Sequence, residues 1–222
     1  MSDSDSFIEE VTEEVRRDRL FNAMKRYGPI AAMAVFALVG GAAFNEYRKG
    51  QATILAQATG DAVIAALSDD DPLKRAEALT GVDVENPSAA AITTLLAAGE
   101  QASGGDNDAA IAGLKSVSDN AELPLIYRQI ATFKLLAVQA DSISVEDRRA
   151  GYEALIGPGS ELRLLAEEQL ALIDVETGTT EAAVTRLQAI AVDAAATAGL
   201  RRRATQLIVA LGGTPNATTP GQ

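Results

Sequence analysis

The sequence predicts an all-α protein in which one N-terminal transmembrane helix precedes a solenoid of helical hairpins. Three observations lead to this prediction. Residues 28–44 contain no charged side chain. After residue 50, apolar residues recur at helical spacing between short turns rich in Gly and Pro. Hydrophobic residues make up 47% of the chain but aromatic residues only 4%, and this Ala- and Leu-rich composition is typical of packed helices.

The predicted transmembrane helix covers residues 27–47. Its uncharged run, GPIAAMAVFALVGGAAF, is about 26 Å long as a helix, slightly less than the thickness of a bilayer core. Tyr27 and Tyr47 flank this run, at the positions where interfacial aromatic residues occur in membrane proteins. The alternative is a helix buried in the core of a globular domain, which the basic residues on both sides of the run disfavour.

The basic residues around this segment predict its orientation. More of them precede the segment than come after it: Arg16, Arg17, Arg19, Lys25 and Arg26 against Arg48 and Lys49. The positive-inside rule therefore places the N-terminus in the cytoplasm and the rest of the chain across the membrane. A cleaved signal peptide is the alternative, since Gly41-Ala42-Ala43 resembles a cleavage site. The long acidic leader favours an uncleaved anchor instead.

The segments after the span read as paired helices. We expect a cytoplasmic segment over 1–26, a stalk with the first helices over 48–86, a helical domain over 87–212 and a disordered tail over 213–222. Within the helical domain, the apolar spacing predicts three pairs and one capping helix. The pairs are 87–102 with 106–117, 123–140 with 144–156, and 160–176 with 179–192, and the cap is 198–211.

Two of these pairs share a turn pattern. Gly105-Asp106 is followed by Ala109 and Ala110, and Gly178-Thr179 is followed by Ala182 and Ala183. The separation of the two turns is close to twice the ~34-residue tetratricopeptide repeat (TPR) period, so the sequence predicts a TPR-like solenoid. The full TPR consensus is not met, and an irregular helical bundle is the alternative. Stacked hairpins form a surface that binds peptide segments.

The composition argues against several other functions. The chain has no Cys and no His, so the usual zinc sites, a thiol nucleophile and a Ser-His dyad are excluded. A net charge of −12 disfavours binding to nucleic acid. We therefore expect no enzyme activity, no cofactor and no metal. The run Asp69-Asp70-Asp71 is predicted to form a helix cap with acidic first-turn residues rather than a cation site, and so are Asp106 and Asp108. Glu167 and Glu168 are expected in solvent.

Protein binding is thus the predicted activity, and five residues are candidates for it. Tyr127 and Tyr152 are candidate surface anchors because Tyr is favoured at interfaces, although Tyr also packs between repeats. The other candidates form the dense basic run Arg201, Arg202 and Arg203, which could contact an acidic partner or lie on a solvated helix face.

The run SFIEEVTEEVRRDRLFNAMKRYGPI, the apolar span and the helical domain from Gln51 resemble the YfgM-like ancillary SecYEG translocon subunit family. This resemblance implies a single-pass protein of the bacterial inner membrane, with a cytoplasmic N-terminus and a periplasmic TPR-like domain. It also implies association with the protein-export channel and a chaperone network that includes a membrane-anchored peptidyl-prolyl-isomerase-like protein. Many relatives carry Trp near the span, and this chain has none.

The resulting functional prediction is a non-catalytic accessory factor of the Sec translocon and the periplasmic chaperone network. Its partners would be translocon subunits, periplasmic chaperones or client polypeptides. The alternative is a structural scaffold for another envelope complex, such as one for cell-wall synthesis or outer-membrane assembly. That protein would have the same fold and anchor and would differ only in its partner.

Overall fold

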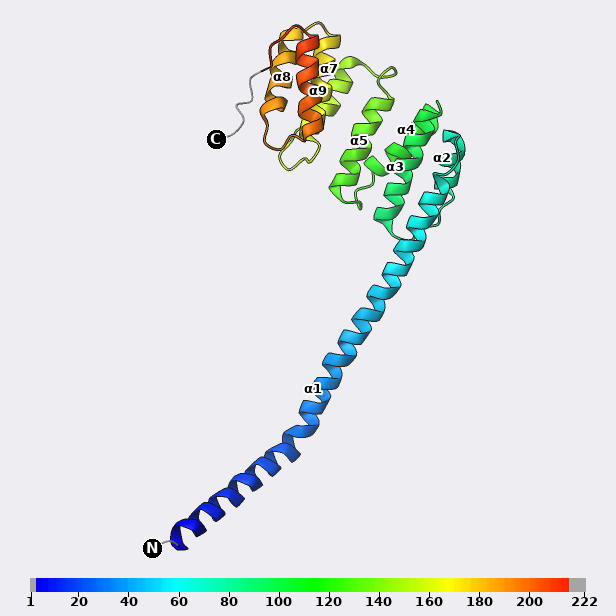
Figure 1. The fold of residues 1–222 in the computed structure, drawn as a ribbon. Helices are drawn as coiled ribbons and strands as arrows, with labels where there is room; N and C mark the ends of the chain where they lie inside the picture. Colours follow the sequence, from blue (N-terminus) through cyan, green and yellow to red (C-terminus); the bar gives the residue numbers. More distant parts are fainter. Residues whose placement is uncertain (1–2, 216–222) are drawn as a thin grey trace. The chain divides into compact units, whose positions relative to one another are not determined.

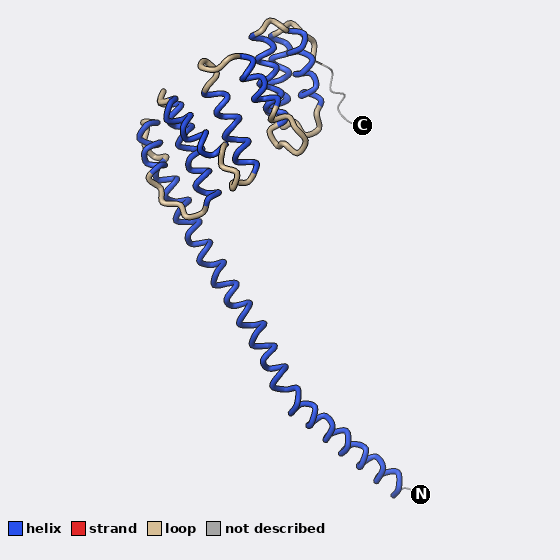
Figure 2. Tube along the Cα trace, turned by 180° about the vertical axis from the view of Figure 1, so that it is seen from behind, coloured by secondary structure: helices blue, strands red, loops and turns tan. Residues whose placement is uncertain are grey.

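The structure, a computed structural model, describes the backbone of residues 3–215. Its side chains are described from residue 36 onward, together with Lys25 and Met33. Within this part of the chain every regular element is an α-helix (Figures 1 and 2), so the predicted all-α class is confirmed. The chain divides into two compact units, Met1–Ala58 and Thr59–Gln222. The helix α1 (Asp3–Ala66) contributes to both.

In the described residues, the second unit contains the end of α1 and eight shorter helices, and each helix predicted after residue 87 is found here within a few residues. The helices are α2 (Pro72–Thr80), α3 (Pro87–Ser103), α4 (Asn107–Ser118), α5 (Leu125–Val138), α6 (Val145–Glu153), α7 (Arg163–Glu176), α8 (Thr180–Val192) and α9 (Ala198–Ala210). Helix α2 packs closely on α3, so the first helices of the predicted stalk belong to the solenoid.

Short polar side chains begin several of these helices, as predicted. The Asp71 carboxylate accepts a hydrogen bond from the backbone N–H of Leu73 at 2.9 Å, and Pro72 is the first residue of α2. Asp106 accepts from the N–H of Ala109 at 3.1 Å at the start of α4. Each cap satisfies a backbone donor that the first helical turn leaves without a partner.

Helices α3, α7 and α9 end in the same way. Gly105, Gly178 and Gly212 come after these helices with φ of +84°, +78° and +79°. After each glycine, the next N–H donates to a carbonyl five residues earlier, at 2.9, 2.8 and 2.9 Å. This is the Schellman motif, which needs a residue free to adopt a left-handed conformation. Positions 178 and 212 differ by the 34-residue TPR period.

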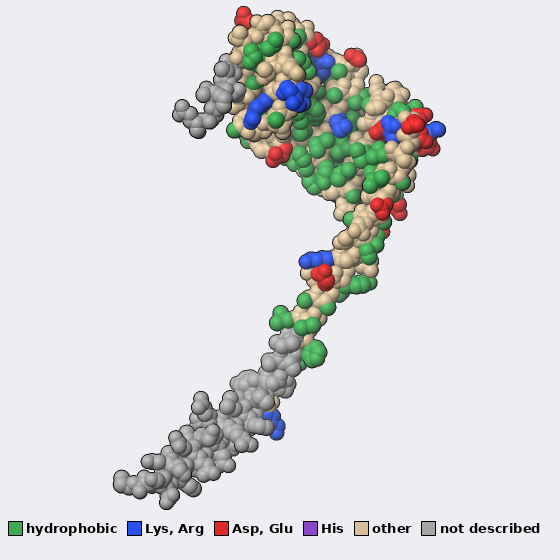
Figure 3. All heavy atoms as spheres, in the orientation of Figure 1, with side chains coloured by type: hydrophobic (Ala, Val, Ile, Leu, Met, Phe, Trp, Pro, Cys, Tyr) green, Lys and Arg blue, Asp and Glu red, His purple; other side chains and the backbone are tan. Residues whose placement is uncertain are grey.

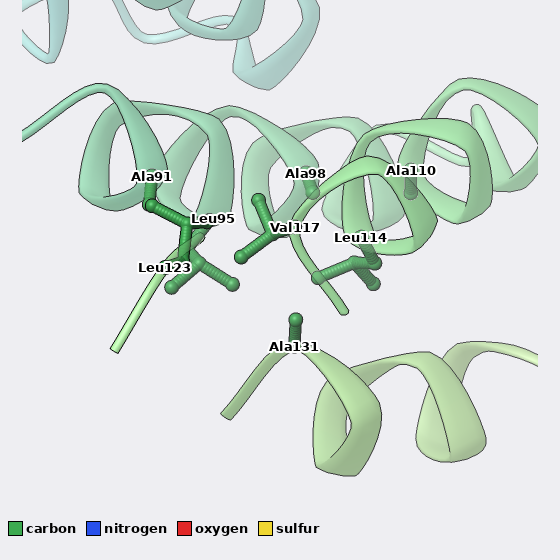
Figure 4. Close-up of a cluster of buried hydrophobic side chains, with 8 residues drawn as sticks. All are labelled: Ala91, Leu95, Ala98, Ala110, Leu114, Val117, Leu123 and Ala131. Atoms are coloured by element: carbon green, nitrogen blue, oxygen red, sulfur yellow. The ribbon is translucent and has the colours of Figure 1, made fainter. Parts of the chain in front are cut away.

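Buried alanines bring the helices together. Ala98 on α3, Ala110 on α4 and Ala131 on α5 are at most 1% exposed, and Leu114 fills the space between the three helices (Figure 4). The arrangement recurs further along the chain with a constant shift in number. Ala98 corresponds to Ala171, Ala110 to Ala183, Leu114 to Leu187 and Val117 to Ile190, and all of these are buried. The TPR-like repeat is therefore present in the packing as well as in the turns.

The middle pair departs from the expected hairpin. Helix α6 packs more closely on α7 than on α5. Arg148 is the fourth residue of α6, where α4 and α8 have Ala110 and Ala183. A guanidinium cannot be packed between two helices as a methyl group can. Helices α5 and α6 meet where Gly151 lies against Leu136 and where the ring of Tyr152 contacts that of Phe133.

No helix in the described part of the chain is both long enough and apolar enough to cross a membrane. The side chains of residues 27–32, 34 and 35 in the predicted span lie outside that description, as do most of those in the predicted segment 1–26. Residues 216–222 of the predicted tail also lie outside it. The transmembrane helix and the tail therefore stay predictions.

The turn after α7 yields a test of the repeat geometry. A Cβ on Gly178 would meet no atom within 4 Å, so Gly178→Ala changes only the backbone preference at φ +78°. We expect it to lower the free energy of unfolding by about 1–2 kcal/mol. Gly199→Ala on α9 also meets no atom within 4 Å and should stabilise by up to about 1 kcal/mol. Denaturant titration followed by circular dichroism measures the free energy of unfolding of both variants. The same change in both would contradict a left-handed conformation at Gly178.

Candidate protein-binding surface

Helix α3 leaves apolar side chains uncovered on one side. Ala91, Leu95 and Ala98 are buried against α4 and α5. On another side of the same helix, Ile92 is 43% exposed and Leu96 is 37% exposed. Gly99 lies at the next helical turn, so Ile92, Leu96 and Gly99 form one row along α3. Within the described residues, Ile92 and Leu96 are the large apolar side chains of α3 that stay exposed.

Helix α5 provides a second row. Ile126 and Ile130 are half-buried and Lys134 is exposed, and their spacing of four residues places them on one side of the helix. The Lys134 Nζ lies 3.7 Å from the position that a Cβ on Gly99 would occupy, so the two rows adjoin. We call this surface the α3–α5 face: Ile92, Leu96, Gly99, Ile126, Ile130 and Lys134. Figure 3 shows hydrophobic side chains gathered over α3 and α5.

Ion pairs connect the helices at the other end of the domain. Asp174 on α7 is only 3% exposed and pairs with Arg149 at 2.8 Å and with Arg186 at 3.2 Å. Arg186 also pairs with Glu167 at 2.5 Å. Burial lowers the pKa of Arg186, but the hydrogen bonds that its guanidinium donates to Glu167 and Asp174 outweigh this effect, so the pKa is raised. These ion pairs connect α6, α7 and α8.

The predicted basic run on α9 is mostly engaged within the protein. Arg203 forms two hydrogen bonds of 2.8 Å to Glu168, which raise the pKa of its guanidinium. Arg201 donates to the carbonyls of Asp193 and Ala194 at 3.2 Å. Arg202 is exposed. The expectation that Glu168 is solvated is wrong, because its side chain is buried against α9 where Arg203 neutralises it.

The two candidate tyrosines lie in different environments. Tyr152 is only 2% exposed and its ring meets that of Phe133 edge-on, with centroids 5.5 Å apart. Burial raises the pKa of its phenol, and the nearby Arg148 opposes this shift. As a surface anchor Tyr152 is therefore a wrong prediction, since it belongs to the core between α5, α6 and α7. Tyr127 is half-buried and packs against the core cluster of α3, α4 and α5.

A shallow groove of about 460 Å³ lies between α7 and α8, and sequence reasoning did not find it. Its polar rim is paired internally, because Arg163 bonds Asp193 at 2.7 Å and Arg186 bonds Glu167. No group of acidic side chains in the described residues is arranged to hold a metal ion. The groove thus offers neither a free charge nor a metal site.

The model of the tetratricopeptide repeat-like domain matches residues 24–150, which is more than half of the chain. The chain belongs to this family. No curated protein and no solved structure matches it. A TPR-like domain is a protein–protein interaction module, so this chain carries such a module. The matched range contains the whole α3–α5 face, whereas α7, α8 and α9 lie beyond it.

The ion pair between Arg163 and Asp193, just after α8, predicts how the stability of the protein depends on pH. The hydrogen bond from Arg163 and the backbone N–H of Ala195 lower the pKa of Asp193. A lowered folded-state pKa contributes stability above about pH 4, and this stability is lost as the pH falls. Asp193→Asn should therefore unfold at lower denaturant than the unsubstituted protein at pH 7, and the difference should shrink at pH 3.

The matched control for this prediction is Asp141→Asn, which changes an exposed carboxylate in the turn between α5 and α6. We expect it to leave the unfolding midpoint nearly unchanged at both pH values. A midpoint difference for Asp193→Asn that is the same at pH 7 and pH 3 would show that the charge of this carboxylate does not stabilise the fold.

Proposed function

We propose that this chain is a membrane-anchored accessory factor of the Sec translocon and the periplasmic chaperone network. It binds segments of other polypeptides on its TPR-like domain and performs no chemistry itself. The observation that carries the proposal is the α3–α5 face, where Ile92 and Leu96 are exposed on a domain of a protein-binding family. Large apolar side chains next to one another on a soluble surface are typical of interaction sites.

The described side chains of α1 support the membrane anchor. Met33, Phe36, Leu38, Val39 and Phe44 are each more than 60% exposed. At 100° per residue they point to all sides of the helix, whereas a helix on a protein core has a single apolar stripe. Lipid is the surrounding that covers an apolar helix on every side, so these residues favour a bilayer around residues 27–47.

The proposed compartment and partners are supported by features of the sequence. The excess of Arg and Lys before residue 27 favours a cytoplasmic N-terminus and a periplasmic TPR-like domain in the bacterial inner membrane. The resemblance of residues 6–30 to the YfgM-like family supports translocon subunits, chaperones and exported polypeptides as the partners. A scaffold for another envelope complex would use the same anchor and face with a different partner.

The orientation can be tested directly because the chain has no Cys. Single substitutions Ser2→Cys and Thr219→Cys place one thiol at each end. In cells with a permeabilised outer membrane, an impermeant maleimide should label Thr219→Cys, and Ser2→Cys should react only after lysis. Labelling of Ser2→Cys in intact inner membranes would reverse the topology and remove the periplasmic function.

The partners can be identified by photo-crosslinking in cells. A photoreactive amino acid at Ile92, Leu96 or Ile130 should form adducts with translocon subunits, chaperones or exported chains, identified by mass spectrometry. The same amino acid at Lys115 or Glu153, exposed positions outside the α3–α5 face, should form few. Adducts confined to one stable complex of cell-wall or outer-membrane assembly would assign the chain to the scaffold function.

A further inference from the structure

The α3–α5 face combines apolar rows with one isolated positive charge. Ile92 and Leu96 lie on one side of it, and Ile126 and Ile130 lie on the other. Lys134 is exposed at the point where the rows adjoin, above Gly99. Gly99 has no side chain that could cover or pair with the ammonium group. Lys134 is thus the only charged residue of the α3–α5 face, and position 99 beside it has no side chain.

Lys134 differs from the ion-paired arginines of the same domain. Arg75, Arg149, Arg163, Arg186 and Arg203 each pair with a carboxylate at 3.2 Å or less. Across residues 36–215, where side chains are described, Lys134 has no such carboxylate. In a protein of net charge −12, a cation left without a carboxylate on an apolar surface is available to a partner.

We infer that the α3–α5 face accepts an amphipathic helix whose apolar side carries one acidic residue, and that this residue pairs with Lys134. The inference rests on the proposed function and specifies its partner. Rows of side chains at a spacing of four residues are ridges that fit the grooves of another helix. A helix is therefore the shape that matches both rows at once.

The charge of Lys134 favours an acidic residue at the facing position of the partner helix. A wholly apolar helix on this face would desolvate the Lys134 ammonium without replacing its water, which opposes binding. A basic residue at that point would add repulsion. A carboxylate compensates the desolvation through a charge-assisted hydrogen bond. The net negative charge of the chain opposes an acidic partner at long range, but salt screens this effect beyond about 8 Å, so the contact pair decides.

The test uses the full-length chain with a fluorophore on Ser103→Cys, at an exposed position in the same row as Ile92, Leu96 and Gly99. The probes are two amidated amphipathic peptides of about 18 residues, built from Leu, Ala and Gln, which differ only in a central Glu or Gln on the apolar side. Each peptide is titrated against the unsubstituted face and against Lys134→Gln and Lys134→Glu. Comparing proteins with the same peptide cancels any binding of that peptide to detergent.

The Glu peptide should bind the unsubstituted face about two- to fivefold more tightly than the Gln peptide. Lys134→Gln should abolish this preference and Lys134→Glu should reverse it, because the Glu peptide would then meet a like charge. Lys115→Gln, which removes an exposed lysine from α4, should leave the preference unchanged. Circular dichroism checks that each variant keeps the helical fold.

Three results would overturn the inference. Equal affinity of the face for both peptides, or equal weakening of both by Lys134→Gln, would show that Lys134 does not read an acidic residue. The absence of binding by either peptide would show that the face does not accept an isolated helix. In each case, crosslinks from Ile92, Leu96 and Ile130 in cells would still support the proposed function, so failure of this inference can be distinguished from failure of the proposed function.

Discussion

Close contact between helices through buried alanines is the constraint on which the TPR-like domain depends. Ala110, Ala131, Ala166, Ala183 and Ala204 have no exposed surface. A methyl group at these positions allows neighbouring backbones to approach, and the larger side chains of Leu114 and Leu187 then fill the spaces beside them. Neighbouring helices among α3 to α5 and among α7 to α9 pack closely through these alanines, and the chain has no cysteine that could form a disulfide.

Helix α6, in the middle of the solenoid, has no such buried alanine, and the helix packing changes there. Arg148 replaces the alanine of the fourth position in α6, and the helix packs mainly on α7, with Tyr152 and Leu170 in the shared core. From this point onward the contacts include many charges, and Asp174 and Glu168 bind arginines from other helices. Most ion pairs between helices in the described residues therefore lie among α6 to α9, whereas α3 has one, between Arg75 and Glu100, beside the exposed Ile92 and Leu96.

Local signals in the sequence were enough to predict the elements. The Asp and Asn caps, the prolines next to them and the glycines at 105, 178 and 212 act within one or two turns, so the chain around them fixes where helices begin and end. The candidate site was less predictable. Tyr152 was a candidate surface anchor because Tyr is favoured at interfaces, yet it is buried against Phe133 of α5. Arg203 was a candidate contact for an acidic partner, yet it pairs with Glu168 of α7.

The sequence by itself determined the all-α class, the order of the helices and the repeated turns, because each depends on neighbours along one helix. Only the tertiary structure decided which faces of those helices are covered. Ile92 and Leu95 are equally apolar and lie three residues apart, but α4 and α5 cover Leu95 and leave Ile92 exposed. Burial depends on helices that are brought together from elsewhere in the chain, and the spacing of residues along one helix does not contain that information.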